Sequence, residues 1–177
     1  MKIYAIRHGL TEQNKKGIFN GHIDEVLLPE GIEQAKEAMS LIPKNIKHIY
    51  SSSMKRARET AEVLNSEIKV PISYHDELKE VSMGTFDGLP FTEDRKIKHK
   101  SLQYDWRPQG GESVEDVKKR VLKILNEIKL NGEDGEVLIV THGGVIRLLH
   151  FLEKGTLLDD IVNMSLQIFD LDKILSD

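Results

Sequence analysis

Strand-like runs alternate with helix-like patterns along this chain, and the alternation limits the folds that it can adopt. Residues 2–6, 46–50 and 137–140 are short runs rich in apolar residues, and each is followed by polar residues or glycine. Amphipathic patterns come after them, most clearly at residues 31–42 and 113–128, where apolar side chains recur every three or four positions. Such strands and helices build βαβ units, in which a largely parallel sheet is covered on both faces. The sequence therefore predicts an α/β layered fold.

Local signals refine this prediction. Two further strands are expected at residues 70–74 and 166–171. Pro29 suits the first turn of a helix, and Ser113 with Asp116 resembles a capping box at the start of the second amphipathic pattern. These residues set the expected helix starts.

The composition restricts the class of protein. Hydrophobic residues make up 39% and charged residues 31% of 177 positions, and the chain has no repeat or linker, so we expect a single domain over residues 1–177. Cysteine is absent, which excludes disulfides and thiolate metal sites. The formal net charge of −4 argues against a general nucleic-acid binder, and no apolar run reaches the roughly 20 residues of a membrane helix. We expect a cytoplasmic protein with neither kind of partner.

Basic and histidine side chains follow three of the predicted strands. Arg7 and His8 come directly after the first strand, Arg56 follows the second, and His142 with Gly143 follows the third. In open α/β sheets, ligands bind beyond the carboxyl ends of the strands, where these residues should meet. Arginines and the N–H groups at helix amino termini bind anions, and phosphate is the anion that such a site fits.

A histidine among arginines favours catalysis over simple binding. A neutral imidazole can attack phosphorus through one nitrogen while the other nitrogen donates to a backbone carbonyl, and cationic neighbours keep the ring neutral. His8 is the expected nucleophile, with Arg7, Arg56 and His142 balancing the charge of the transferred phosphoryl group. No two histidines stand one helical turn apart with supporting carboxylates, as metallohydrolase sites require, so neither a metal nor another cofactor is expected.

Five motifs carry a family resemblance. RHGLT at residues 7–11, SSSMKRARETA at 51–61, ELKEVSMGTFDG at 77–88, GGES at 110–113 and THGG at 141–144 resemble, in order and spacing, the histidine phosphatase superfamily, also called the phosphoglycerate mutase-like family. The resemblance covers residue 3 to about residue 149. It implies a three-layer α/β/α sandwich with a central, mostly parallel mixed sheet.

The resemblance also implies roles for single residues. A phosphohistidine would form on His8, and Arg7, Arg56 and His142 would make the phosphate pocket. Glu80 would protonate the leaving oxygen and then activate water. A carboxyl group that is partly buried beside a dianionic substrate can hold a proton for this task. Further substrate contacts are expected from Asn14, Asn20, Gly21 and Gly143.

The chain departs from the family pattern at three places. Leu10 stands where the family usually has Glu or Gln, and Asn20 stands where many relatives have Gln near the phosphate. Leu28 and Pro29 replace the usual Thr-Glu pair before a long helix, which removes a side-chain N-cap. We expect catalysis to survive all three changes.

These residues predict a metal-independent phosphomonoester hydrolase that acts on a small phosphorylated metabolite, α-ribazole phosphatase-like enzymes being among the similar-sized relatives. Two alternatives stay open: phosphoglycerate mutase-type phosphoryl transfer, and a phospholigand-binding module without turnover. Neither the physiological substrate nor the oligomeric state follows from the sequence.

Residues 89–109 show no clean periodicity and mix Lys and Arg with Tyr104 and Trp106, so we interpret them as a short insertion over the active site. The insertion either recognises the non-phosphate part of the substrate or, as we favour, forms a mobile lid with a solvated charged face. Trp106 could instead belong to the core.

Other residues have more ordinary interpretations. Arg147 could be a charge on a helix surface, and His99 is expected to be exposed or hydrogen-bonded. His22 and Asp24 could line the entrance to the site, and Ser113 either touches substrate or only starts a helix.

Overall fold

A single mixed sheet forms the centre of the molecule. The computed structural model describes residues 1–131 and 135–176. Within them, five strands pair in the order β3-β2-β4-β1-β5. The β1·β4, β2·β4 and β2·β3 pairs are parallel, and β5 runs antiparallel to β1 at one edge. The strands are β1 (Lys2–Arg7), β2 (Ile46–Ser52), β3 (Ile72–His75), β4 (Glu136–Thr141) and β5 (Leu166–Asp170).

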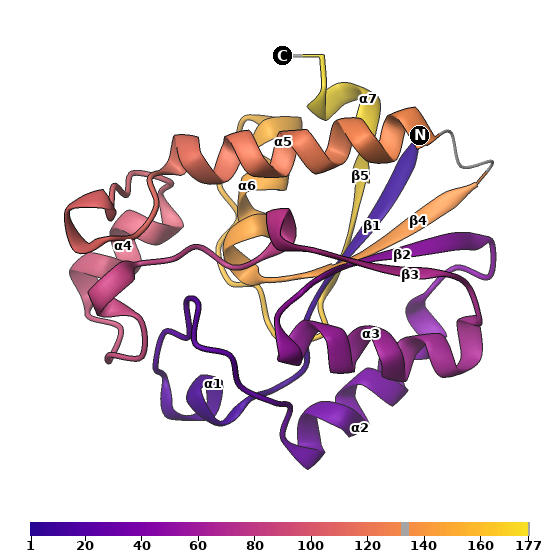
Figure 1. Cartoon of the computed structure of the whole chain (residues 1–177), viewed down its shortest axis with the longest axis horizontal. Coiled ribbons are helices and arrows are strands. Elements are labelled where there is room, and N and C mark those ends of the chain that lie inside the picture. The colour runs from indigo at the N-terminus through magenta and orange to yellow at the C-terminus, as the bar shows by residue number, and fades with distance from the viewer. Residues whose placement is uncertain (132–134, 177) are drawn as a thin grey trace.

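Helices cover both faces of this sheet (Figure 1). One layer contains α5, α6 and α7, and the opposite layer contains α2 and α3. The prediction of a three-layer α/β/α sandwich with a mostly parallel mixed sheet is confirmed. The helices are α1 (Glu12–Lys16), α2 (Pro29–Ala38), α3 (Lys55–Ile68), α4 (Glu93–Lys100), α5 (Val114–Asn131), α6 (Gly143–Lys154) and α7 (Leu171–Ile174).

The two central strands divide their side chains between two cores. Successive side chains of a strand point to opposite faces, so Ile3 and Ala5 of β1 join the cluster under α5, α6 and α7. Tyr4 and Ile6 of the same strand join the cluster under α2 and α3. Because both faces are covered, β1 and β4 are almost continuously apolar, as strands inside a parallel sheet must be.

The predicted helix starts are confirmed. Pro29 lies in the first turn of α2, and Leu28 provides no side-chain cap there. Ser113 Oγ accepts from the Asp116 backbone N–H at 3.2 Å, while the Asp116 carboxylate accepts from the Ser113 N–H at 2.9 Å, which is the capping box expected for α5. The α2 pattern is shorter than predicted, because after Ala38 the chain tightens into a 3₁₀ turn at Met39–Leu41.

Residues 89–109 are less solvated than the expected lid. They contain α4, which lies at one end of the molecule in Figure 1. Tyr104 and Trp106 are 3% and 5% exposed and belong to the core cluster under α5, so the prediction of a solvated lid is wrong for this half of the segment. These two rings attach the segment to the core, although its sequence shows no periodic pattern of apolar residues.

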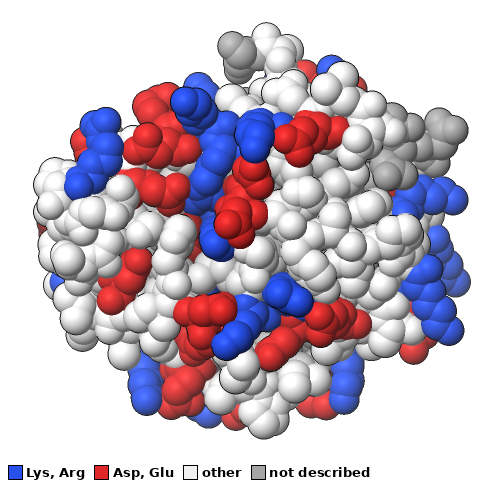
Figure 2. Space-filling view, in the orientation of Figure 1, with Lys and Arg blue, Asp and Glu red and all other residues white. Residues whose placement is uncertain are grey.

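The surface charge and the apolar character of the helices relate to the predictions about nucleic-acid and membrane partners. On the face drawn in Figure 2, acidic and basic side chains are interspersed. Among the described residues, no helix is long and apolar enough to cross a membrane.

Candidate functional site

A cavity of about 490 Å³ opens where β1, β2 and β4 end. Arg7 and His8 reach it from the end of β1, Arg56 from the first turn of α3, and Gly143 from the first turn of α6. Glu80 also lines it and comes from the loop that follows β3. Strand ends therefore bring together residues that are up to 136 positions apart (143 − 7).

His8 is held in one tautomer by its two neighbours. The residue is 2% exposed, and its Nδ1 lies 2.8 Å from the Gly9 carbonyl oxygen. Arg56 Nε lies 3.3 Å from His8 Nε2, and a guanidinium can only donate. Nε2 therefore accepts and Nδ1 carries the proton. This leaves a neutral imidazole whose Nε2 lone pair faces a cation.

Arg56 is fully buried and anchored by backbone carbonyl groups. Its Nη1 donates to Ile23 O at 2.7 Å, and its Nη2 donates to Gly21 O at 2.9 Å. Gly21 has a φ of +48°, and a Cβ there would lie 1.7 Å from the Asp87 carboxylate. Only glycine fits this turn, and the turn aims a carbonyl at Arg56. Gly21 is not among the residues that line the cavity, so its predicted substrate contact becomes a supporting role for Arg56.

His142 lies directly against His8 but does not line the cavity. The two ring centroids are 5.0 Å apart, and His142 Nε2 is 2.8 Å from Ser52 Oγ at the end of β2. Burial, followed by the charge of Arg56, holds the pKa of His142 well below 6.5. Burial, Arg56 and Arg7 do the same to the pKa of His8. Both rings are therefore neutral near pH 7.

Glu80 sits at the amino terminus of α6. Its carboxylate accepts from the Gly144 backbone N–H at 3.2 Å through both oxygens and from its neighbour Val81 N–H at 2.8 Å. A Cβ on Gly144 would lie 2.3 Å from Glu80 Oε1, so this close approach requires glycine. Glu80 is 7% exposed and lines the cavity, so its carboxyl group can reach a bound molecule.

Three guanidinium groups surround this carboxylate. Burial lowers the pKa values of Arg7, Arg56 and Arg147, and in each case the strongest opposing influence is the charge of Glu80. Arg7 Nη1 donates to Ile161 O, while its Nε is buried without a hydrogen-bond partner in the described part of the chain. The cavity therefore carries more positive than negative charge at its floor, as an anion site requires.

Three asparagines form the remaining polar side of the cavity. Asn163 Nδ2 donates to His8 O at 2.9 Å and to Asn14 Oδ1 at 3.1 Å. Asn20 Nδ2 donates to Thr11 Oγ1 at 3.1 Å, and its Oδ1 is buried without a partner. All three asparagines line the cavity, and Asn14 and Asn20 are two of the residues expected to contact substrate. The sequence does not predict Asn163, since nothing in its local sequence marks it.

Arg147 is not the charge on a helix surface that the sequence suggests. It is 5% exposed and lines the cavity, and it donates to the carbonyl groups of Leu158 at 3.1 Å and Asp159 at 2.8 Å. These bonds tie α6 to the loop that carries Asn163. A signal exists in the sequence, because Arg147 interrupts the apolar run VIRLL.

The structure also places four other residues that the sequence singles out. His99 is 4% exposed and lines the cavity, with its Nδ1 buried and without a partner among the described residues, so it is not a surface histidine, and at least this nitrogen is not hydrogen-bonded. Ser113 is used by the α5 cap and does not line the cavity. His22 and Asp24 line a separate pocket of about 150 Å³. Lys79, which also lines this second pocket, belongs to the same loop as Glu80.

The described residues contain no group of three or more His, Asp or Glu side chains placed to hold a metal ion. The floor of the site combines histidine and arginine side chains with the buried carboxylate of Glu80 at the carboxyl ends of the strands, where open α/β sheets bind their ligands. That arrangement defines an α/β protein whose candidate site suits an anion.

Comparison with known proteins gives the family. Residues 3–172 match the sequence profile of the histidine phosphatase superfamily (branch 1), and the chain belongs to this family. A probable phosphatase of Schizosaccharomyces pombe is 40% identical over 87% of this chain and 75% of its own length. A putative phosphoserine phosphatase of Hydrogenobacter thermophilus is 31% identical over 92% of this chain and 83% of its own length.

A solved structure supports the same assignment. The mycobacterial glucosyl-3-phosphoglycerate phosphatase, solved with VO3, is 26% identical and superposes with a TM-score of 0.84 over 94% of this chain and 90% of its own. The resemblance carried by the sequence motifs is therefore confirmed, and the relatives support a phosphatase.

Proposed function

We propose that this protein hydrolyses phosphate monoesters of small metabolites through a phosphohistidine on His8. The observation that carries the proposal is the tautomer of His8. Its Nδ1–H donates a hydrogen bond to Gly9 O. Its Nε2 lone pair faces Arg56 Nε at 3.3 Å, beside the cavity. A neutral nitrogen nucleophile and a phosphate-binding cation thus meet at one point.

In the first step, His8 Nε2 attacks phosphorus, an N–P bond forms and the ester O–P bond breaks. Glu80, protonated beside the bound dianionic ester, gives this proton to the departing alcohol oxygen and is left as a carboxylate. Arg7, Arg56 and the free N–H groups at the start of α6 compensate the charge on the phosphoryl oxygens. His142, fixed by Ser52 and packed on His8, keeps the nucleophile oriented.

In the second step, water attacks the phosphohistidine and Glu80 takes its proton. The N–P bond breaks, inorganic phosphate leaves and His8 returns to the neutral form. Each residue in these steps comes from this chain, so we propose a metal-independent reaction. Full activity after treatment with a chelator is the expected result.

The test uses His8→Ala with a panel of phosphorylated metabolites. Loss of the nucleophile should reduce turnover at least about 10⁴-fold on every ester of the panel. Phosphate binding and the circular dichroism spectrum should persist. Wild type, quenched during turnover, should carry acid-labile, base-stable phosphate that the variant lacks. Near wild-type turnover in the variant would refute the mechanism.

The same panel separates the two alternatives. A mutase would isomerise a phosphoglycerate and respond to a bisphosphorylated primer, whereas we expect release of free phosphate without a primer. A binding module would retain phosphate affinity in wild type but release no phosphate from any ester.

A further inference from the structure

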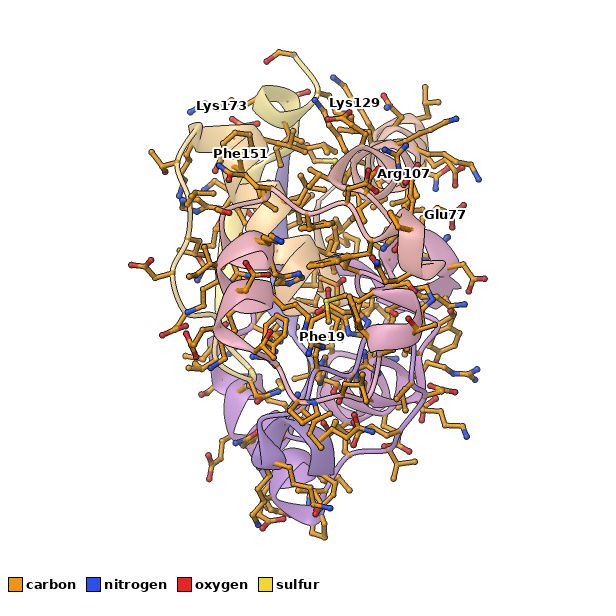
Figure 3. All side chains as sticks on the ribbon, turned by 90° about the vertical axis from the view of Figure 1, so that its left-hand side faces the viewer. Phe19, Glu77, Arg107, Lys129, Phe151 and Lys173 are labelled. Atoms are coloured by element: carbon orange, nitrogen blue, oxygen red, sulfur yellow. The ribbon has the colours of Figure 1, made fainter. Side chains whose placement is uncertain are left out.

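One side of the cavity is an aromatic wall that the proposed chemistry does not use. The wall consists of Phe19, Phe91 and His99, which all line the cavity. Phe19 stacks on Phe91 with ring centroids 4.9 Å apart, and the His99 ring meets Phe19 at 5.1 Å and Phe91 at 5.7 Å, both edge to face. In Figure 3, Phe19 lies near the middle of the face that is turned to the viewer, between the ribbons of the amino-terminal segment and of α4.

His99 is the one member of this wall with polar side-chain atoms. It stacks on Tyr104 at 5.4 Å on the side of the core, and its buried Nδ1 has no partner in the described part of the chain. Burial lowers the pKa of His99 to about 4, so the ring is neutral near pH 7. A buried polar atom without a partner is costly, and a bound molecule that supplies a hydrogen bond would recover that cost.

The wall lies beside the acid that serves the leaving group. A Cβ on Gly144 would meet Glu80 Oε1 at 2.3 Å and His99 Cε1 at 3.1 Å, so the carboxylate and the imidazole edge face the same point. Nδ1 is bonded to Cε1 and belongs to that edge. Under the proposed mechanism, Glu80 protonates the alcohol oxygen of the ester. The alcohol half of the substrate therefore lies next to the wall.

The rest of this part of the cavity is apolar or already paired. Ile18, Ile161 and Val162 also line it. The two lysines at its rim have carboxylate partners: Lys96 donates to Glu93 at 2.8 Å, and Lys100 donates to Asp160. A flat apolar group with one polar atom fits such a lining better than a second anionic group does.

We propose that the alcohol half of the substrate carries a heteroaromatic ring, which lies against Phe19 and Phe91 and shares a hydrogen bond with the imidazole of His99. This inference rests on the proposed hydrolysis of phosphate monoesters and names the class of ester. It makes His99 a specificity-determining residue in addition to the residues that handle the phosphate.

The probes are esters of primary alcohols, so their leaving groups are of comparable quality. Propyl phosphate and benzyl phosphate differ by the ring, and benzyl phosphate and the three pyridylmethyl phosphates differ by one ring nitrogen. In wild type, kcat/KM should be about tenfold or more higher for benzyl than for propyl phosphate, because the ring buries apolar surface. At least one pyridylmethyl isomer should exceed benzyl phosphate by about tenfold.

Two variants locate these preferences. Phe91→Leu should reduce the benzyl-to-propyl ratio by about fivefold or more, since a flat contact surface is lost. His99→Phe keeps a ring but removes its nitrogens, so the preference for pyridylmethyl over benzyl phosphate should disappear. Phe151→Leu is the matched control: Phe151 is 42% exposed on α6, lies away from Phe19 in Figure 3 and should leave both ratios unchanged.

The outcomes separate this inference from the proposed function. Equal kcat/KM values for propyl, benzyl and pyridylmethyl phosphates in wild type would overturn the inference and leave phosphatase activity intact. Hydrolysis of none of these esters or of the metabolite panel would overturn the proposed function itself. If His99→Phe does not fold, as its circular dichroism spectrum would show, the wild-type ratios and Phe91→Leu still decide the matter.

Discussion

The two sides of the cavity are held in place by different forces. The floor, made of Arg7, His8, Arg56 and Glu80 with His142 packed behind His8, comes from strand ends, helix starts and the loop after β3, and is fixed mainly by hydrogen bonds to backbone groups and to Ser52. The aromatic wall has ring packing as its chief support, and two of its three residues belong to the segment 89–109. The phosphate group is the same in every phosphate ester, whereas the alcohol differs from one ester to the next. The hydrogen-bonded floor suits the constant group, and the wall of packed rings suits the variable one.

Arg56→Lys should damage the floor more than any substitution proposed below. Lysine cannot reach Ile23 O, Gly21 O and His8 Nε2 at once, so buried carbonyl groups lose their partners and the phosphoryl oxygens lose a planar pair of donors. We expect kcat/KM to fall about 10²- to 10³-fold on all esters alike, as steady-state kinetics would measure.

The matched control for this substitution is Arg58→Lys. Arg58 lies two positions further along α3, is exposed and packs over the Tyr74 ring at 4.5 Å. Its replacement should leave kcat/KM within about twofold, since surface substitutions have small effects. Equal losses in both variants would mean that replacing any arginine in this part of α3 weakens the enzyme, so that the anchored fork of Arg56 has no particular role.

Glu80→Gln should have a somewhat smaller effect that depends on the leaving group. The amide cannot donate an acidic proton, so kcat/KM for alkyl phosphates, which reports only the steps up to the phosphohistidine, should fall about 10²-fold, whereas kcat/KM for p-nitrophenyl phosphate, whose leaving group needs no protonation, should fall much less. Steady-state kinetics on both esters measures the difference.

Glu77→Gln is the control, because Glu77 pairs with Lys123 on the surface at 2.6 Å and does not line the cavity. A loss in Glu80→Gln that is the same for both esters would contradict the assignment of Glu80 as the acid.

The smallest expected effect is on the pH dependence of stability, to which the buried histidines of the floor and of the wall both contribute. In the folded protein, burial lowers the pKa of His99 to about 4 and holds those of His8 and His142 well below 6.5. Below about pH 6.5 the unfolded chain therefore binds more protons than the folded protein. The free energy of unfolding should be highest above that pH and fall as the pH drops, by about 1.4 kcal/mol per pH unit for each histidine.

His99→Phe should remove one of these three contributions. Urea unfolding between pH 6.5 and 5 measures the slope of the free energy of unfolding against pH. This slope should be smaller in the variant than in wild type by the contribution of about one proton. An identical slope in both proteins would mean that His99 is already protonated in the folded state at these pH values.

The floor could be predicted from the sequence to a large extent. RHG and THGG end apolar runs, and the rule that strand ends meet at one rim places His8, Arg56 and His142 together. The strands predicted at residues 70–74 and 166–171 agree with β3 and β5 within about two positions. Period-two and period-3.6 patterns are local, so local sequence is enough to reveal them.

The wall could not be predicted in the same way. His99 is one of seven histidines, and its neighbours in the sequence are lysines that point to a solvated helix. Its burial results from contact with Phe19, 80 positions earlier (99 − 19), and with Tyr104. Asn163 escapes prediction for the same reason, since its partners are His8 and Asn14 at the other end of the chain.

The sequence by itself determined the layered sheet and the histidines and arginines that gather at the ends of its strands, because backbone periodicity and the ends of parallel strands obey rules of short range. Only the tertiary structure decided which tautomer His8 adopts, that Arg147 and His99 are buried in the cavity, and that Gly21 supports Arg56 from behind it. These properties depend on contacts between segments far apart in the chain. Burial and hydrogen-bond partners at such contacts follow from packing in three dimensions.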